Sequence, residues 1–481
     1  MKKRLLLYPL VLIVFGLGIC AVLQQGRQLQ PPQPAAGIPS ASPAQAPAAG
    51  VAPAASLLAA LPQHFQDPLT RLFVQLILIL IVARICGVVA RKAGQPAVIG
   101  EMVAGILLGP SLLGWLWPDA FGFIFPQTSL GTLRMLSQIG VCLFMFVVGM
   151  ELDVNELKHQ AHTVVLVSKV SILFPYLLGV AASLFLFPAF GVSGTKFIPF
   201  ALFIGISMSI TAFPVLARIL EERGLTKTAL GATALACAAA NDVMAWTVLA
   251  VVVAIAKAGG LAVTFVSIGL VVLFVAVMLL WLRPRLALWI NRTTDTTSAP
   301  GGGVMAAALV FLFACALITD VIGIHALFGA FLAGVVMPRH GVFREVLKER
   351  LEHFSTVFLL PLFFVFTGLR TQMGLLNEPS GWLICLALII VATIGKLGGT
   401  MVTARLTGVN WIDSFSLGAL MNSRGLIELI ALNIGYDLGI LSPPMFTMLV
   451  IMALLTTGLT GPLLTLGDCL RARKALAIKP A

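Results

Sequence analysis

Charged residues are scarce in this sequence. Asp, Glu, Lys and Arg together make up 10% of its 481 residues, while hydrophobic residues make up 59% and the mean hydropathy is +1.03. A soluble chain of this length would carry about a quarter charged residues. The composition therefore excludes a soluble globular protein and predicts an all-α polytopic membrane protein whose surroundings are the lipid bilayer.

Several motifs of other protein classes are also missing. The seven cysteines are scattered, mostly within apolar runs, without the spacing of a zinc site or of a disulfide framework. There is no His-Glu-x-x-His sequence, no potassium-filter sequence and no glycine-rich nucleotide-binding fingerprint. We therefore expect no enzyme and no cofactor. The net charge of +12 lies in short loops between apolar runs, which indicates membrane topology rather than a nucleic-acid partner.

Apolar runs long enough to cross a bilayer as helices follow residue 67, and we count about thirteen of them. The expected spans are 69–90, 96–115, 131–150, 163–190, 197–219, 228–256, 262–283, 303–321, 323–338, 354–370, 381–404, 414–436 and 443–466. Basic residues gather in alternate loops, most densely from Arg339 to Arg350, and this asymmetry places the C-terminus in the cytoplasm. A membrane domain over 68–466 would then precede a short basic cytoplasmic tail over 467–481.

The N-terminus is predicted to be a separate segment. Met1 to Arg4 is basic and precedes an apolar run, so residues 1–24 resemble either a signal peptide or an uncleaved signal anchor. Residues 25–67 are rich in Pro, Ala, Gln and Ser, which is typical of a disordered tether. In both cases this tether lies outside the cytoplasm.

Segments in the two halves of the chain match each other at low resolution. Residues 104–110 correspond to 333–338, and residues 143–149 correspond to 362–368. Each half also has one span interrupted near its middle, at 209–214 and at 421–425. The matches occur in the same order on spans of opposite direction, which is the pattern of an inverted-topology repeat in secondary transporters.

The two interrupted spans are expected to be broken helices that cross each other. Pro214 lacks an N–H donor and disfavours helix at the residue before it. The freed carbonyl groups near Ser209 and Thr211 then need cover from protein or water. Carbonyl oxygens and helix ends at such a crossing suit a small cation, so Ser209 and Thr211 are candidate ion-binding residues.

Asn241 and Asp242 stand in the middle of the apolar run 228–256. A carboxylate at that depth costs about 2.5–3.5 kcal/mol, which a membrane helix bears when the group has a function or a partner. One interpretation is a buried structural hydrogen bond. The other is an acid that holds either a proton or a monovalent cation, with oxygen atoms of Asn241 and Thr211 completing the coordination shell. Competition for Asp242 would then convert a proton gradient into cation movement.

Three more ionisable residues lie within expected spans. Arg424 is about ten residues from either end of its span, too deep to reach the interface freely, so it either holds the crossing or pairs with Glu428 one turn later. Lys396 lies among small residues, where it either extends to the cytoplasmic interface or is a cation near the ion site.

The combination of these motifs resembles the monovalent cation:proton antiporters of the second cation:proton antiporter family. The matching segments are 100–110, 211–214, 241–242 and 422–425. The resemblance implies thirteen helices, a homodimer in the bacterial inner membrane, and a six-helix core that contains the crossed broken helices and moves against a dimerisation domain. It also implies exchange of Na+ or K+ for H+, with Asp242 as the ion-carrying carboxylate beside Asn241. Thr211 and Arg424 would lie in the two crossings, and Lys396 would be the core lysine.

One departure from the family pattern bears on stoichiometry. Electrogenic members have two adjacent aspartates where this chain has Asn241 and Asp242. With a single acid, we expect electroneutral one-for-one exchange, unless Lys396 also releases a proton. The alternative functions on the same scaffold are a monovalent cation channel and a non-transporting membrane sensor.

Overall fold

The computed structural model describes residues 7–31, 67–151, 162–225, 227–257, 261–286, 288, 302–323, 325–338 and 342–478. Most of the tether expected at 25–67 lies outside these ranges, as do residues 1–6 and 479–481. All elements in the described ranges are helical, apart from one isolated bridge between Gly191 and Leu441. The all-α fold expected from the composition is confirmed.

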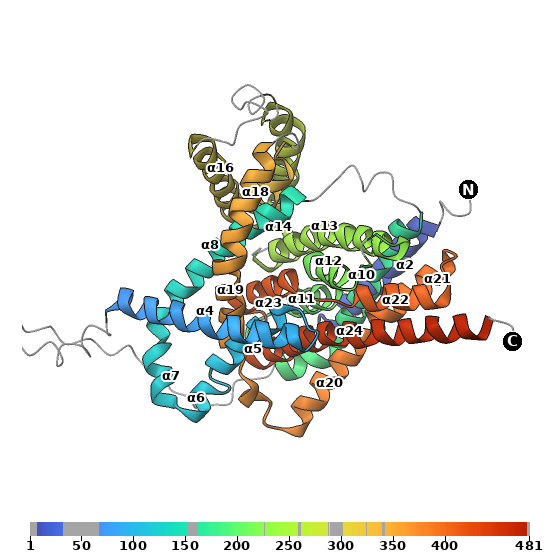
Figure 1. Cartoon of the computed structure of the whole chain (residues 1–481), viewed down its shortest axis with the longest axis horizontal. Coiled ribbons are helices and arrows are strands. Elements are labelled where there is room, and N and C mark those ends of the chain that lie inside the picture. The colour runs from blue at the N-terminus through green and yellow to red at the C-terminus, as the bar shows by residue number, and fades with distance from the viewer. Residues whose placement is uncertain are drawn as a thin grey trace, which may run out of the picture.

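The helices follow the apolar runs of the sequence (Figure 1). Up to the middle of the chain they are α2 (Leu7–Gly26), α4 (Pro68–Lys92), α5 (Ala97–Leu108), α6 (Leu113–Leu116), α7 (Pro118–Ile124), α8 (Gln127–Glu151), α10 (His162–Phe190), α11 (Phe197–Ser209), α12 (Phe213–Glu222) and α13 (Ala229–Lys257). Next come α14 (Leu261–Ala276), the π-helical turn η1 (Val277–Leu282), α16 (Gly302–Val321), α17 (Ala326–Val335), α18 (Val342–Phe354), the π-turn η2 (Ser355–Leu359) and α19 (Leu360–Leu369). The last are the 3₁₀ turn η3 (Met373–Leu376), α20 (Pro379–Thr393), the π-turn η4 (Ile394–Gly398), α21 (Gly399–Leu406), α22 (Trp411–Met421), α23 (Leu426–Asp437) and α24 (Pro443–Ile478).

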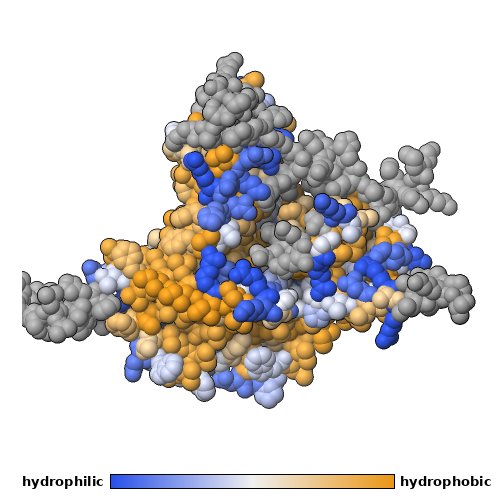
Figure 2. All heavy atoms as spheres, viewed as in Figure 1, coloured by the Kyte–Doolittle hydropathy of each residue, from blue (hydrophilic) through white to orange (hydrophobic). Residues whose placement is uncertain are grey.

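The protein is an integral membrane protein. Ten helices in the described ranges are long and apolar enough to cross a bilayer, or eleven if α22 and α23, bent by 43° at their junction, form one span. Their outer faces carry exposed Leu, Ile, Val and Phe side chains. Figure 2 shows this hydrophobic surface over α4 and the helices beside it, while hydrophilic side chains gather over α18. An apolar exterior of this extent requires lipid around it.

Two close contacts between glycine residues join the halves of the chain. Gly105 on α5 touches Gly368 on α19, and a Cβ on either residue would overlap the backbone of the other helix. Gly149 on α8 touches Gly334 on α17 in the same way. The repeat proposed from the sequence pairs Gly105 with Gly334 and Gly149 with Gly368. If the two halves are related by this repeat, the contact between Gly105 and Gly368 must have an equivalent between Gly334 and Gly149. The structure contains both contacts.

The N-terminal helix α2 packs on α10 and α11. The rings of Phe15 and Phe174 meet edge to face with 6.1 Å between centroids. Gly18 lies against the side chain of Leu177, and Gly26 is buried against the ring of Phe197, where a Cβ would overlap the ring. These contacts pack α2 against α10 and α11 of the folded chain.

We therefore expect α2 to remain attached to the mature protein. An intact-mass measurement should show residues 1–26 retained. In a cysteine-free background, the pair Gly18→Cys and Leu177→Cys should cross-link with a short bifunctional reagent. The control pair, Leu17→Cys with Leu177→Cys, should not, because Leu17 is 66% exposed. Loss of the first 20 or so residues, as for a cleaved signal peptide, would contradict this expectation.

Candidate ion site

The site is built on two breaks in membrane helices that cross each other. One break lies between α11 and α12, and the other between α22 and α23. The backbone N–H of Ala212 in the first break donates to the carbonyl oxygen of Ser423 in the second, at 3.1 Å. The Thr211 hydroxyl donates to the carbonyl oxygen of Met421, at 3.0 Å. Each break thus supplies hydrogen-bond partners that the other lost when its helix was interrupted.

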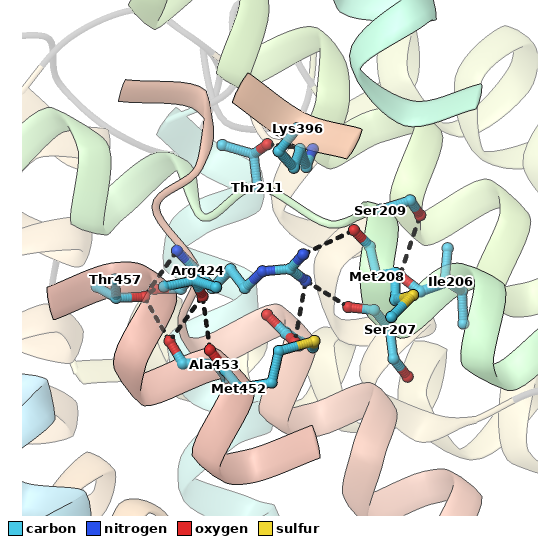
Figure 3. A network of polar contacts seen from close by, with 12 residues as sticks. Ile206, Ser207, Met208, Ser209, Thr211, Lys396, Arg424, Met452, Ala453 and Thr457 are labelled. Atoms are coloured by element: carbon cyan, nitrogen blue, oxygen red, sulfur yellow. Dashed lines mark hydrogen bonds and ion pairs between the residues drawn. The ribbon is translucent and has the colours of Figure 1, made fainter. Parts of the chain in front are cut away.

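Arg424 binds the end of the opposite broken helix (Figure 3). Its Nη1 donates to the carbonyl oxygen of Ser207 at 2.6 Å, and its Nη2 donates to that of Met208 at 2.8 Å. These carbonyls lie in the last turn of α11, where the helix dipole concentrates partial negative charge. The buried guanidinium therefore satisfies the carbonyl groups and neutralises the helix end.

The charge of Arg424 is balanced within its own half-helix. Nη1 forms an ion pair of 3.1 Å with Oε1 of Glu428, and both side chains are fully buried. Glu428 lies in the first turn of α23, where a negative charge is favoured by the helix dipole. Thr457 on α24 accepts from the backbone N–H of Arg424 at 2.9 Å, and its single hydrogen lies within reach of the carbonyl oxygens of Arg424, at 2.9 Å, and of Ala453, at 2.8 Å. The side chain holds the crossing and also pairs with Glu428, so the structure contains both arrangements considered from the sequence.

Asp242 lies beside the start of the other half-helix. It is 2% exposed, and its carboxylate lies close to the backbone N–H of Phe213, the first residue of α12. The Oδ1 atom of the carboxylate is buried and has no hydrogen-bond partner among the described residues. A helix N-terminus favours an anion, but one carboxylate oxygen is left with no donor in this conformation.

Asn241 and Lys396 meet at the hydroxyl of Thr211. Lys396 Nζ donates to Thr211 Oγ1 at 2.6 Å, and Asn241 Nδ2 donates to the same oxygen at 3.2 Å. The second hydrogen of Asn241 Nδ2 goes to Ser171 Oγ on α10, at 2.9 Å. All four side chains are completely buried. The network ties α10, α13 and the helix of Lys396 to the crossing.

Lys396 is placed by a π-helical turn. The turn η4 contains the segment Ile394–Gly398 and interrupts the α-helix formed by α20 and α21. Such a bulge shifts the side chains within it relative to a regular helix, and bulges of this kind are frequent at functional sites. Here Lys396 lies beside Thr211, as Figure 3 shows, and within electrostatic range of Asp242.

Hydrogen-bond capacity identifies the oxygen atoms that are free to bind a cation. The Thr211 hydroxyl has one hydrogen and two lone pairs, and all three are used by Met421, Lys396 and Asn241. Oδ1 of Asn241 has only a long contact of 3.4 Å from Ser171, whose single hydrogen also has an acceptor in Ser168. Oδ1 of Asp242 has none. In this conformation both Oδ1 atoms are available as ligands. Oδ1 of Asn422 and Oε2 of Glu428 in the second break are also buried without a partner among the described residues, and Oγ of Ser209 keeps its lone pairs.

The structure brings most of the expected site residues together. Asn241, Thr211 and Lys396 share hydrogen bonds near Asp242, and Arg424 with Glu428 forms the second part of the crossing. Ser209 is buried nearby, but its hydroxyl donates to the carbonyl oxygen of Ile206 in its own helix, at 3.0 Å. Two contributing residues went unnoticed in the sequence, Ser171 and Thr457. Hydroxyl residues in apolar helices commonly bond to their own backbone, so neither carried a signal.

Comparison with known proteins identifies the family. The family signature described as "Sodium/hydrogen exchanger, transmembrane" matches residues 77–466. The chain belongs to this family. Family members are transporters, in agreement with the expectation that the chain is not an enzyme. The matched residues include both helix breaks and Asp242, so the family membership covers the whole of the candidate site.

Individual relatives support the same assignment. The Na(+)/H(+) antiporter NhaS4 of Synechocystis sp. is 41% identical over 82% of this chain and 97% of that protein. The Na(+)/H(+)-K(+) antiporter GerN of Bacillus cereus is 30% identical over 84% of this chain and 98% of that protein. The chain spans about half the length of the Arabidopsis thaliana cation/H(+) antiporters that it also matches. The sodium proton antiporter MjNhaP1 of Methanocaldococcus jannaschii has the same fold, with a TM-score of 0.61 at 16% identity over 82% of this chain and 96% of its own.

Removal of the Arg424 side chain should destabilise the protein strongly. Arg424→Ala leaves Glu428 as an uncompensated buried charge and the end of α11 without its donors. Breaking a buried pair in this way typically costs about 3–5 kcal/mol. We expect a large fall in the midpoint of thermal unfolding in detergent. The double variant Arg424→Met with Glu428→Met removes both charges and should recover part of the loss. A single variant with unchanged thermal stability would contradict a structural role for Arg424.

Proposed function

We propose that the protein is a secondary active transporter that exchanges a monovalent cation, Na+ or K+, for H+ by alternating access. One observation carries the proposal: the buried carboxylate of Asp242 has an unpartnered oxygen atom beside two crossed helix breaks. The names of the related antiporters, which specify Na+/H+ and K+ exchange for those proteins, support it.

The exchange follows from charge neutralisation at one carboxylate. A buried carboxylate is stable when a proton or a cation neutralises its charge. A cation bound at Asp242 would take Oδ1 of Asp242 and Oδ1 of Asn241 as its first protein ligands, with further oxygen atoms from water or from the helix breaks. A proton on Asp242 removes the charge that the cation needs. The two substrates therefore compete for Asp242, and movement of the loaded site couples their gradients.

Thr211 and Lys396 would regulate access to the coordination shell. In this structure the Thr211 hydroxyl is fully used, so it can bind a cation only after Lys396 or Asn241 releases it. Lys396 lies within electrostatic range of Asp242, so a proton on its amine would repel an arriving cation and stabilise the empty carboxylate. We infer that cation binding at Asp242 displaces Lys396 from its present position.

The burial of the site fits an occluded intermediate. Asp242, Asn241, Thr211 and Lys396 are each at most 2% exposed, so bulk water reaches none of them from either side. Alternating access then requires the crossing and α13 to move relative to the helices that surround them. We propose thirteen membrane spans after residue 67, a homodimer, a cytoplasmic C-terminus and the plasma membrane of a bacterium as the setting for this movement.

Asp242→Asn should abolish exchange and leave folding intact, because the amide keeps the shape of the side chain but carries no charge. Cation-dependent proton flux in proteoliposomes, measured with Na+, K+ and Li+, is the test, and the thermal unfolding midpoint is the folding control. Asp320→Asn makes the same chemical change at an exposed residue of α16 and should keep the wild-type flux. Exchange at the wild-type rate by Asp242→Asn would end the proposal, and a conductance without saturable counter-exchange would indicate a channel.

Exchange should be electroneutral, with one proton for one monovalent cation. Asn241 cannot ionise, so Asp242 supplies one negative charge, which either substrate neutralises. Sodium flux in proteoliposomes clamped with valinomycin at different potassium ratios should therefore be independent of the imposed potential, once potassium is shown not to be a substrate. A systematic dependence on potential would instead mean that Lys396 loses a proton during the cycle.

A further inference from the structure

A cavity of about 600 Å³ lies between α13, α14 with η1, and α17. Figure 1 shows α14 beside α13, the helix that carries Asp242. The described residues that line it are almost all aliphatic or aromatic, and Arg283 is the one charged residue among them. The cavity is outside the ion site, because it includes none of Asp242, Asn241, Thr211 and Lys396.

One wall of the cavity is formed by Trp246, one turn after Asp242 on α13. The indole is 3% exposed and stacks on Phe331 of α17, with 5.9 Å between ring centroids and 21° between planes. Its Nε1–H has no hydrogen-bond partner among the described residues. Trp246 therefore connects the helix of the ion-binding carboxylate to α17 beside the cavity.

The opposite end of the cavity lies near the level of the lipid headgroups. Arg283 directly follows the π-turn η1, and Trp281 and Arg285 lie next to it. Trp281 is 55% exposed, and the guanidinium of Arg285 lies 3.8 Å from the centroid of its ring. Exposed tryptophan and arginine are typical of the boundary between hydrocarbon and water.

The dimensions and the charge fit one kind of molecule. From Val271 to Arg283 the lining helix is about 18 Å long, close to the thickness of one leaflet, which is about 15 Å. An extended apolar space of this length with one arginine at its headgroup end matches an acyl chain with a phosphate above it. We propose that this cavity is a binding site for an anionic phospholipid, with an acyl chain against Trp246 and its phosphate on Arg283.

A lipid in this position would touch both moving and surrounding parts of the proposed transporter. On α13 it contacts Val243 and Trp246, which are one and four residues after Asp242, and on α17 it contacts Phe331. The bound chain fills space between these helices that no side chain fills. Its presence or absence therefore changes the packing that α13 must break in order to move.

Brominated phospholipids provide a test, because bromine quenches tryptophan fluorescence at short range. An indole that is 3% exposed makes almost no contact with bulk lipid, so a headgroup preference in the quenching of Trp246 reports a lipid held in the cavity. The wild-type protein and Trp246→Phe are reconstituted in nanodiscs that contain phosphatidylglycerol or phosphatidylcholine with brominated chains. The difference between the two proteins isolates Trp246 from the other tryptophans.

We expect phosphatidylglycerol to quench Trp246 at about tenfold lower mole fraction than phosphatidylcholine, since the choline cation of the zwitterionic lipid offsets the charge that its phosphate presents to Arg283. Arg283→Gln should abolish this preference. Arg285→Gln removes the neighbouring charge, which is outside the cavity lining, and should retain the preference. Ala250→Phe narrows the cavity and should weaken quenching of Trp246 by both lipids.

Two results would overturn the proposal. Absence of Trp246 quenching by either lipid would show that no acyl chain occupies the cavity. Equal quenching by both lipids in the wild-type protein would show that Arg283 selects no anionic headgroup. If Trp246→Phe does not fold, native mass spectrometry of lipids retained by the wild-type protein and Arg283→Gln replaces the optical measurement. Equal retention of phosphatidylglycerol by these two proteins would again reject the site.

Discussion

The bonds of one buried arginine make the rest of the ion site possible. Two membrane helices are broken near the centre of the protein, and each break exposes carbonyl and amide groups where no bulk water is available to solvate them. The Arg424 guanidinium occupies the end of α11, and its charge is balanced by Glu428 at the start of α23. Because these ends are satisfied, Thr211 and the first turn of α12 have fixed positions, and Asp242 can lie against a helix N-terminus.

The principal features of the site could be predicted from the sequence because each is costly in a membrane. A proline inside an apolar run, a carboxylate at its middle and an arginine ten or so residues from either interface need a structural or functional reason, and all three belong to the observed site. The remaining features carry no comparable cost. Ser171 and Thr457 resemble other hydroxyl residues of apolar helices, and the π-turn at Lys396 is a local change of helical winding that composition does not specify. Ser209 stays a predicted ion ligand: its hydroxyl hydrogen bonds within α11, and its lone pairs remain available.

The hydrogen-bond arrangement separates two kinds of residue in the site. Arg424 and Thr457 belong to a part that is fixed, since their bonds reach backbone groups of other helices, and Glu428 pairs with Arg424. Lys396, Thr211 and Asn241 form a second part around one hydroxyl oxygen, in which Lys396 and Asn241 bind Thr211 by side-chain bonds and Thr211 donates to the Met421 carbonyl. Exchanging one side-chain donor for a cation in the second part leaves the first intact. A site divided in this way can change its ligands without unfolding its helix ends.

The paired glycine contacts have a consequence for how force passes through the protein. At Gly105 with Gly368, and at Gly149 with Gly334, backbone meets backbone and no side chain lies between the helices. These backbone contacts involve no side-chain rotamers that could change, so they resist both sliding and bending of the paired helices. The four helices α5, α8, α17 and α19 therefore act as a stiff frame, and any displacement of α13 must be absorbed at softer contacts, such as the stacked rings of Trp246 and Phe331. The contacts in this protein that can yield are those that aromatic and aliphatic side chains make with these four helices.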